Sequence, residues 1–177
     1  WEDRRRSPWM NGTEGLGVED IGAVVIHSGV EVQPDGRVRV AAQTVLAAPG
    51  GPAEQRYGKA VAIVEVQKGV KYHVAVGSFD ILMPTGIGVV YMYSVEAGGG
   101  GDGWGVPAIA QLANLTHPWG WGSYVHSLAA LSGTSGSAHH GVLIVGTNLD
   151  SRCGRTPNAP AGCTDSGSAH VYVLSAP

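Results

Sequence analysis

The sequence predicts an all-β protein built from a repeated unit of short strands. The unit has three motifs in fixed order: an aromatic-glycine pair that opens an apolar run, a run ending in Val-Gly, and an alternating run ending in Ser. It occupies residues 57–94 and again 121–175, and matching glycines of the first two motifs lie 64 and 69 residues apart. A fixed period of this kind indicates a repeat architecture. Glycine makes up 28 of the 177 residues, which suits many tight turns, and no long helical pattern is present.

The expected elements follow in chain order. Residues 1–20 are polar and rich in turn formers, so they predict an N-terminal loop segment, and residues 21–177 hold the repeated strands. Turns are indicated at residues 34–36 (PDG) and 68–69 (KG), and the prolines of residues 49–52 (PGGP) end a strand because proline lacks an amide hydrogen. The expected strands are residues 22–28, 38–46, 57–66, 72–77, 88–95, 108–113, 121–131, 141–146 and 169–175. Four strands in each period of roughly 65 residues are typical of a β-propeller blade or a β-sandwich repeat.

Charge and hydropathy exclude several classes of function. Only 14% of residues are charged and the net charge is −3, so the chain offers no electrostatic attraction for nucleic acid or for an anionic membrane. No Asp, Glu, Lys or Arg lies between Gly103 and Leu149. Pro107, Pro118 and many glycines interrupt this span well before the roughly 18 apolar residues that a membrane helix needs. We therefore expect neither a nucleic-acid partner nor membrane insertion.

No residue pattern predicts catalysis, a metal site or a cofactor. Residues 133–137 (GTSGS) end in serine where a nucleophile elbow has glycine, and no strand-to-helix turn is expected there. His139 and His140 are adjacent, so in a strand they point to opposite faces. The glycine run at residues 98–101 lacks the Lys-Ser/Thr pair of a phosphate-binding loop. We therefore expect a protein that is not an enzyme and that holds no cofactor.

Tryptophans gather in the central part of the chain, around one expected loop. Trp104 and Trp119 are candidate contacts for a protein or carbohydrate partner, because aromatic side chains bury large apolar areas at interfaces. Trp121 stands in an aromatic-glycine motif and is expected in the core instead.

The repeated motifs also resemble a known family. The residues that carry the resemblance are Tyr57-Gly58 and Trp121-Gly122, Val76-Gly77 and Val145-Gly146, residues 88–94 and 169–175, and more weakly residues 22–28. In order and spacing they resemble the FG-GAP repeat of integrin-α-type β-propellers, with its Phe-Gly, Val-Gly-Ala-Pro and Gly-Ala-Val-Tyr-Val-Tyr motifs. The resemblance implies a partial β-propeller of four-stranded blades, with two full repeats and part of a third.

Two departures from the family limit what the resemblance implies. Many members hold calcium in a carboxylate-rich loop, but residues 65–71 contain a single Glu beside two Lys, and residues 132–140 contain no carboxylate. Because calcium takes about six to eight oxygen ligands, several of them carboxylates, we expect no metal. The family's ring has about seven blades, so this chain cannot close alone. It begins at Trp1, and we interpret it as processed or as a piece of a longer chain, with the propeller completed by the rest of that chain or by other protein subunits.

The cysteines and sequons indicate an extracellular setting. Cys153 and Cys163 lie ten residues apart in a loop rich in Gly, Pro and Asn, and we expect them to form a disulfide bond. Asn11 and Asn114 begin Asn-x-Thr sequons and are candidate glycosylation sites. The chain is therefore expected to be secreted or to lie at the cell surface.

Together these expectations favour an extracellular, non-catalytic interaction or structural module. Such a module would mediate protein–protein assembly or adhesion at a cell surface or in an extracellular fibre. Two alternatives stay open. One is a carbohydrate-binding, lectin-like propeller that uses the loop tryptophans and takes glycans as partners. The other is an accessory propeller of a secreted hydrolase.

Overall fold

The computed structural model describes residues 22–49, 57–79, 88–98, 105–116, 125–133, 139–147 and 167–175. All regular structure in these ranges is β-strand, and none of it is helical. No helix there is long and apolar enough to cross a membrane. The strands are β1 (Ala23–Val32), β2 (Val38–Ala47), β3 (Ala60–Gln67), β4 (Lys71–Phe79), β5 (Gly88–Gly98), β6 (Gly105–Thr116), β7 (Ser127–Ser132), β8 (His139–Thr147) and β9 (Ser168–Ser175).

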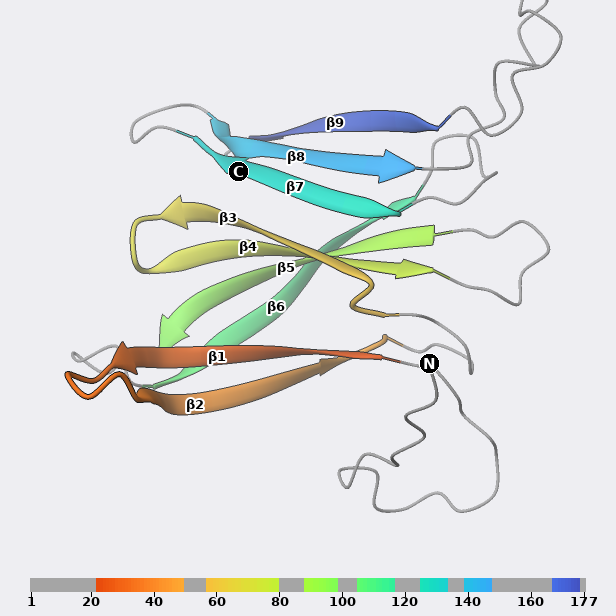
Figure 1. Cartoon of the computed structure of the whole chain (residues 1–177). Helices are drawn as coiled ribbons and strands as arrows, with labels where there is room; N and C mark the ends of the chain where they lie inside the picture. Colours follow the sequence, from red (N-terminus) through yellow and green to blue (C-terminus); the bar gives the residue numbers. More distant parts are fainter. Residues whose placement is uncertain are drawn as a thin grey trace, which may run out of the picture.

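The strands form three antiparallel sheets that follow one another along the chain. Their orders are β1-β2, β3-β4-β5-β6 and β7-β8-β9, so each strand pairs with its neighbours in sequence. The sheets lie face to face in three layers, with the four-stranded middle sheet between the other two (Figure 1). None of the sheets closes on itself within the described residues. The all-β expectation is therefore confirmed at the level of open, stacked antiparallel sheets.

Both turns indicated by the sequence are present. Between β1 and β2, Gly36 has a φ of 81°, and the backbone amide of Arg37 donates to Oδ1 of Asp35 at 2.9 Å. Between β3 and β4, Gly69 has a φ of 68°, and its amide donates to Oε1 of Glu65 at 2.8 Å. A positive φ favours glycine because its backbone meets no Cβ clash. These turns fix the antiparallel registers of their hairpins.

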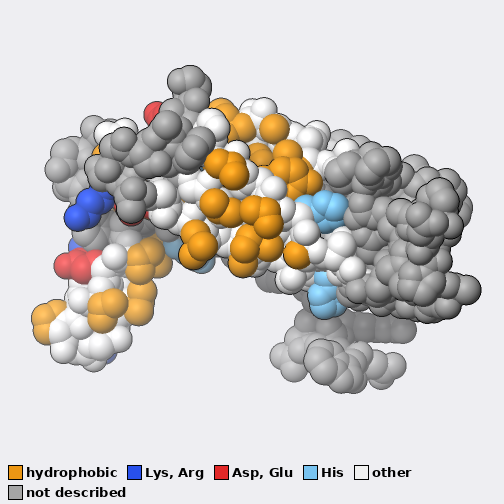
Figure 2. All heavy atoms as spheres, turned by 90° about the horizontal axis from the view of Figure 1, so that it is seen from above, with side chains coloured by type: hydrophobic (Ala, Val, Ile, Leu, Met, Phe, Trp, Pro, Cys, Tyr) orange, Lys and Arg blue, Asp and Glu red, His pale blue; other side chains and the backbone are white. Residues whose placement is uncertain are grey.

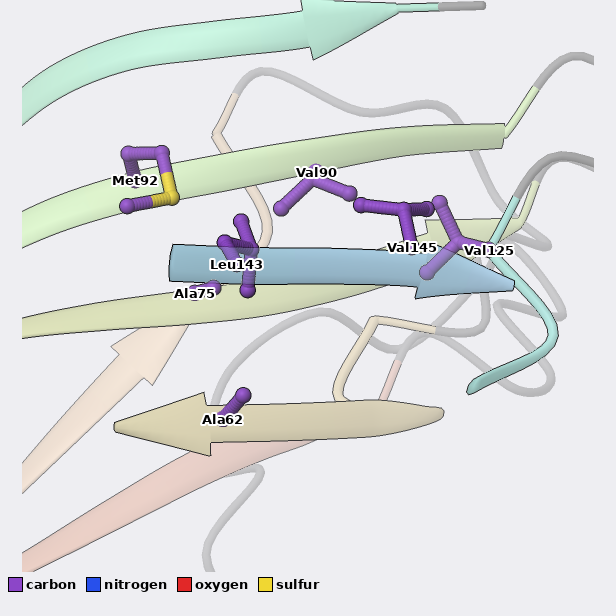
Figure 3. Close-up of a cluster of buried hydrophobic side chains, with 7 residues drawn as sticks. All are labelled: Ala62, Ala75, Val90, Met92, Val125, Leu143 and Val145. Carbon is purple, nitrogen blue, oxygen red and sulfur yellow. The ribbon is translucent and has the colours of Figure 1, made fainter. Parts of the chain in front are cut away.

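Two hydrophobic cores lie between the layers, one on each face of the middle sheet. Strand β5 contributes to both cores because its successive side chains point to opposite faces of the sheet. Val90 and Met92 point into the core shared with β7-β8-β9, whereas Tyr91 and Tyr93 point into the core shared with β1-β2. Figure 3 shows the first core, in which seven buried side chains meet. They are Ala62, Ala75, Val90, Met92, Val125, Leu143 and Val145.

The grouping of the described strands differs from the two full repeats and part of a third that the sequence predicts. β2 and β6 pair with the strands before them, β1 and β5, so the nine described strands divide into sheets of two, four and three. Only β3-β4-β5-β6 holds all four strands of the period. A strand between two others in sequence can join either sheet, and the antiparallel hairpin with its predecessor forms here.

The start of β7 also differs from the expected strand at residues 121–131, because β7 begins at Ser127. Just before it, Val125 has a φ of 70°, which an extended strand cannot contain. The amide of His126 donates to the carbonyl of Gly146 at 2.8 Å, as the amide of Lys59 does to Gly77 at 3.2 Å. Val125 therefore takes the place that Gly58, with a φ of 82°, takes in the first repeat. Gly122, which the sequence motif matches to Gly58, lies outside the described residues.

Candidate interaction sites

One of the six site residues expected from the sequence lies in the described part of the chain. Asn114 is exposed on β6, within the strand rather than after it, and its Oδ1 accepts a hydrogen bond from Nε2 of Gln111 at 2.7 Å. Its side chain thus reaches solvent, as a glycosylation site requires. The remaining five, Asn11, Trp104, Trp119, Cys153 and Cys163, lie outside the described residues.

A buried tyrosine pair lies in the core between β1-β2 and the middle sheet. The hydroxyl of Tyr57 donates to the hydroxyl of Tyr93 at 2.8 Å, and its ring lies against Tyr91 with the centroids 5.7 Å apart. Burial, together with the hydrogen bond to Tyr93, raises the pKa of Tyr57 well above its ordinary value. The fold therefore favours the protonated phenol, which contributes a hydrogen bond and ring packing to this core.

A serine-histidine contact occurs on β9, a pairing that the sequence reasoning missed. Oγ of Ser168 lies 3.1 Å from Nε2 of His170, a distance at which a base can activate a nucleophile. Thr147 lies on the other side: its Oγ1 is 3.0 Å from Oγ of Ser168 and accepts from the Ser168 amide at 3.1 Å. These bonds tie the start of β9 to the end of β8.

Among the described residues, no group of three or more His, Cys, Asp or Glu side chains could hold a metal ion.

An apolar groove of about 500 Å³ opens between β1 and the middle sheet. Its floor includes Val61, Ile63 and Val74 of β3 and β4, and its wall is the run of β1 from residue 24 to residue 30. None of the described residues that line it is Asp, Glu, Lys or Arg. Val61 is 42% exposed and Ile63 is 58% exposed, although both lie on the face of β3 that points toward the β1-β2 layer. The groove is therefore a place where the middle sheet is left uncovered.

The outer face of β7-β8-β9, the face turned away from the middle sheet, is a second apolar surface. Leu131, Val171 and Val173 are exposed on it, with exposed fractions of 66%, 63% and 55%. Apolar side chains gather over this side of the molecule in the view from above (Figure 2). The strands that carry the face contain no Asp, Glu, Lys or Arg. The alternation in residues 168–175 was the sequence signal for it, since Tyr172 and Leu174 pack inward and leave the valines outside.

Comparison with known proteins gives no match: no family model, no curated protein and no solved structure is similar to this chain.

Proposed function

We propose that this chain is a non-catalytic interaction module, built as part of a β-propeller of FG-GAP-like blades, that mediates protein–protein assembly or adhesion. Its place would be a cell surface or an extracellular fibre, in keeping with the disulfide bond expected between its two cysteines and with its sequons. The stacked layers support the propeller reading, because successive antiparallel meander sheets packed face to face are how propeller blades are arranged.

The observation that carries the proposal is the outer face of β7-β8-β9. By the hydrogen-bonded register, Val171 takes the place on β9 that Met92 takes on β5, because Val171 pairs with Ile144 as Met92 pairs with Ala75, each two residues before the glycine of its strand. Met92 is buried by the next sheet, and Val173 lies on the same face of β9 as Val171. The repeat thus presents at its end the same kind of surface that it buries internally. A contiguous uncharged apolar face of this kind marks an interaction site in a protein that is otherwise soluble.

Size-exclusion chromatography with light scattering tests the proposal. The chain should assemble beyond the monomer, and Val173→Glu should abolish assembly, because a carboxylate would be buried against apolar side chains without a partner. Val106→Glu is the matched control, since Val106 is 72% exposed and lies on β6, away from this face. A stable, well-folded monomer at all concentrations would refute the proposal.

A further inference from the structure

Within the described part of the chain, the strand β1 has a neighbouring strand on one side only. Among the described strands it is hydrogen-bonded to β2 alone, whereas β5 lies between β4 and β6. β1 matches β5 in the repeat: Val24 and Ile26 point into the core with the next sheet, as Val90 and Met92 do. The edge of β1 that faces the groove therefore corresponds to the edge of β5 that is hydrogen-bonded to β4.

The floor of the groove also contains apolar side chains that are left exposed. The hydrogen-bonded registers match Val61 and Ile63 of β3 to Leu128 and Ala130 of β7, because Ala60 pairs with Gly77 as Ser127 pairs with Gly146. Leu128 and Ala130 are half-buried and pack against the core, since the middle sheet lies over them. Val61 and Ile63 are exposed because the described strands of the β1-β2 layer do not cover them.

We propose that this groove accepts an extended β-strand from a partner polypeptide, which pairs antiparallel with β1 and covers Val61 and Ile63. The inference rests on the proposed function and specifies one of its partners. In recognition by strand addition, main-chain hydrogen bonds supply affinity, and pockets for alternate side chains supply specificity. The groove offers both, an open strand edge as its wall and an apolar floor beneath it.

The chain itself indicates the chemistry of the strand that fits. β4 and β8 occupy the corresponding place beside β5 and β9, and both contain an apolar run that ends in glycine, Val74-Ala75-Val76-Gly77 in β4. Ala75 points from β4 toward the neighbouring layer, so the incoming strand should place small or β-branched apolar residues on the floor. A charged residue there would be desolvated without a partner, because the lining is uncharged.

A labelled peptide with the sequence of residues 71–79 (KYHVAVGSF) is the probe, and its fluorescence anisotropy with the full chain is the measurement. We expect saturable binding that Ile63→Lys weakens by about tenfold or more, since lysine would place a charge on the floor. Val106→Lys on β6 should leave binding unchanged. The same peptide, N-methylated at the alternate amides that would face β1, should not bind. Hydrogen exchange of the β1 amides should slow when the unmodified peptide is present.

Three results would overturn the proposal. The first is an absence of saturable binding. This would also be the result if another segment of this chain or a second copy already filled the groove. The second is binding that Ile63→Lys leaves intact. The third is equal binding of the N-methylated peptide, which would show apolar adhesion without strand pairing. The variant Val173→Glu separates this proposal from the preceding one, because it alters the outer face of β9 and leaves the groove unchanged.

Discussion

Replacing Gly77 by alanine would place a methyl group where the structure has no room. A Cβ at this position would overlap Cγ1 of Val125, and Val125 is fully buried in the core between the middle sheet and β7-β8-β9. Overpacking of this kind costs about 1–3 kcal/mol of unfolding free energy, because neighbours must leave their rotamers or the backbone must shift. For a chain of this size, that corresponds to a melting temperature lower by about 2–12 °C. Thermal unfolding followed by far-UV circular dichroism measures the change.

Two comparisons make the reasoning refutable. Gly146→Ala is the matched control in β8, where the added methyl would meet Oγ of Ser127, the end of a side chain that can rotate. Its cost should be smaller. In a Val125→Gly background the space beside residue 77 is free, so Gly77→Ala should cost almost nothing more there. Additive effects of the two substitutions would refute the contact as the cause, as would equal stability of the Gly77→Ala and Gly146→Ala variants.

Three further predictions concern the tyrosine pair, metal binding and the cysteines. Tyr57→Phe removes the hydrogen bond to Tyr93 and should lower the unfolding free energy by about 1–2 kcal/mol in urea titrations. A phenol whose pKa is higher folded than unfolded stabilises the fold below its ordinary pKa of 10.0 and loses that contribution as pH rises further. Stability should thus fall above about pH 10, and less steeply in Tyr57→Phe; an identical pH dependence would contradict the assignment. Chelation should leave the melting temperature unchanged, because the Glu65 carboxylate is already engaged by the Gly69 amide, and a drop of several degrees would show a metal site. Intact mass after alkylation without reduction should show no modified thiol at Cys153 or Cys163, and two alkylated thiols would exclude the disulfide.

Strand positions were predictable because the three motifs recur in the same order along the chain. Residues 88–95 and 169–175 were expected to be strands, and β5 and β9 confirm both, although burial alternates along β9 whereas most of β5 is buried on both faces. The grouping of strands into sheets was not predictable, since the pattern of β2 and β6 does not say which neighbour each one joins.

Two local features could not be predicted from the sequence. Val125 is β-branched and has a positive φ, which local propensity disfavours, and its burial against Gly77 becomes visible only in three dimensions. The groove could not be predicted for a different reason. Val61 and Ile63 belong to a run of apolar residues, and such a run predicts a strand buried on both faces. Only the layer opposite determines which face is covered.

The middle sheet takes part in both hydrophobic cores, and this has a consequence for how the fold comes apart. A terminal sheet can detach at the loss of one core, whereas the middle sheet can open only if both cores are lost. Opening should therefore start at the two ends of the stack, in the manner of repeat proteins, and the slowest native-state amide exchange should lie in β4 and β5. Each early opening event also bares one face of β3-β4-β5-β6. Partners that cover the end layers would then slow the opening of the middle sheet, although they do not contact it.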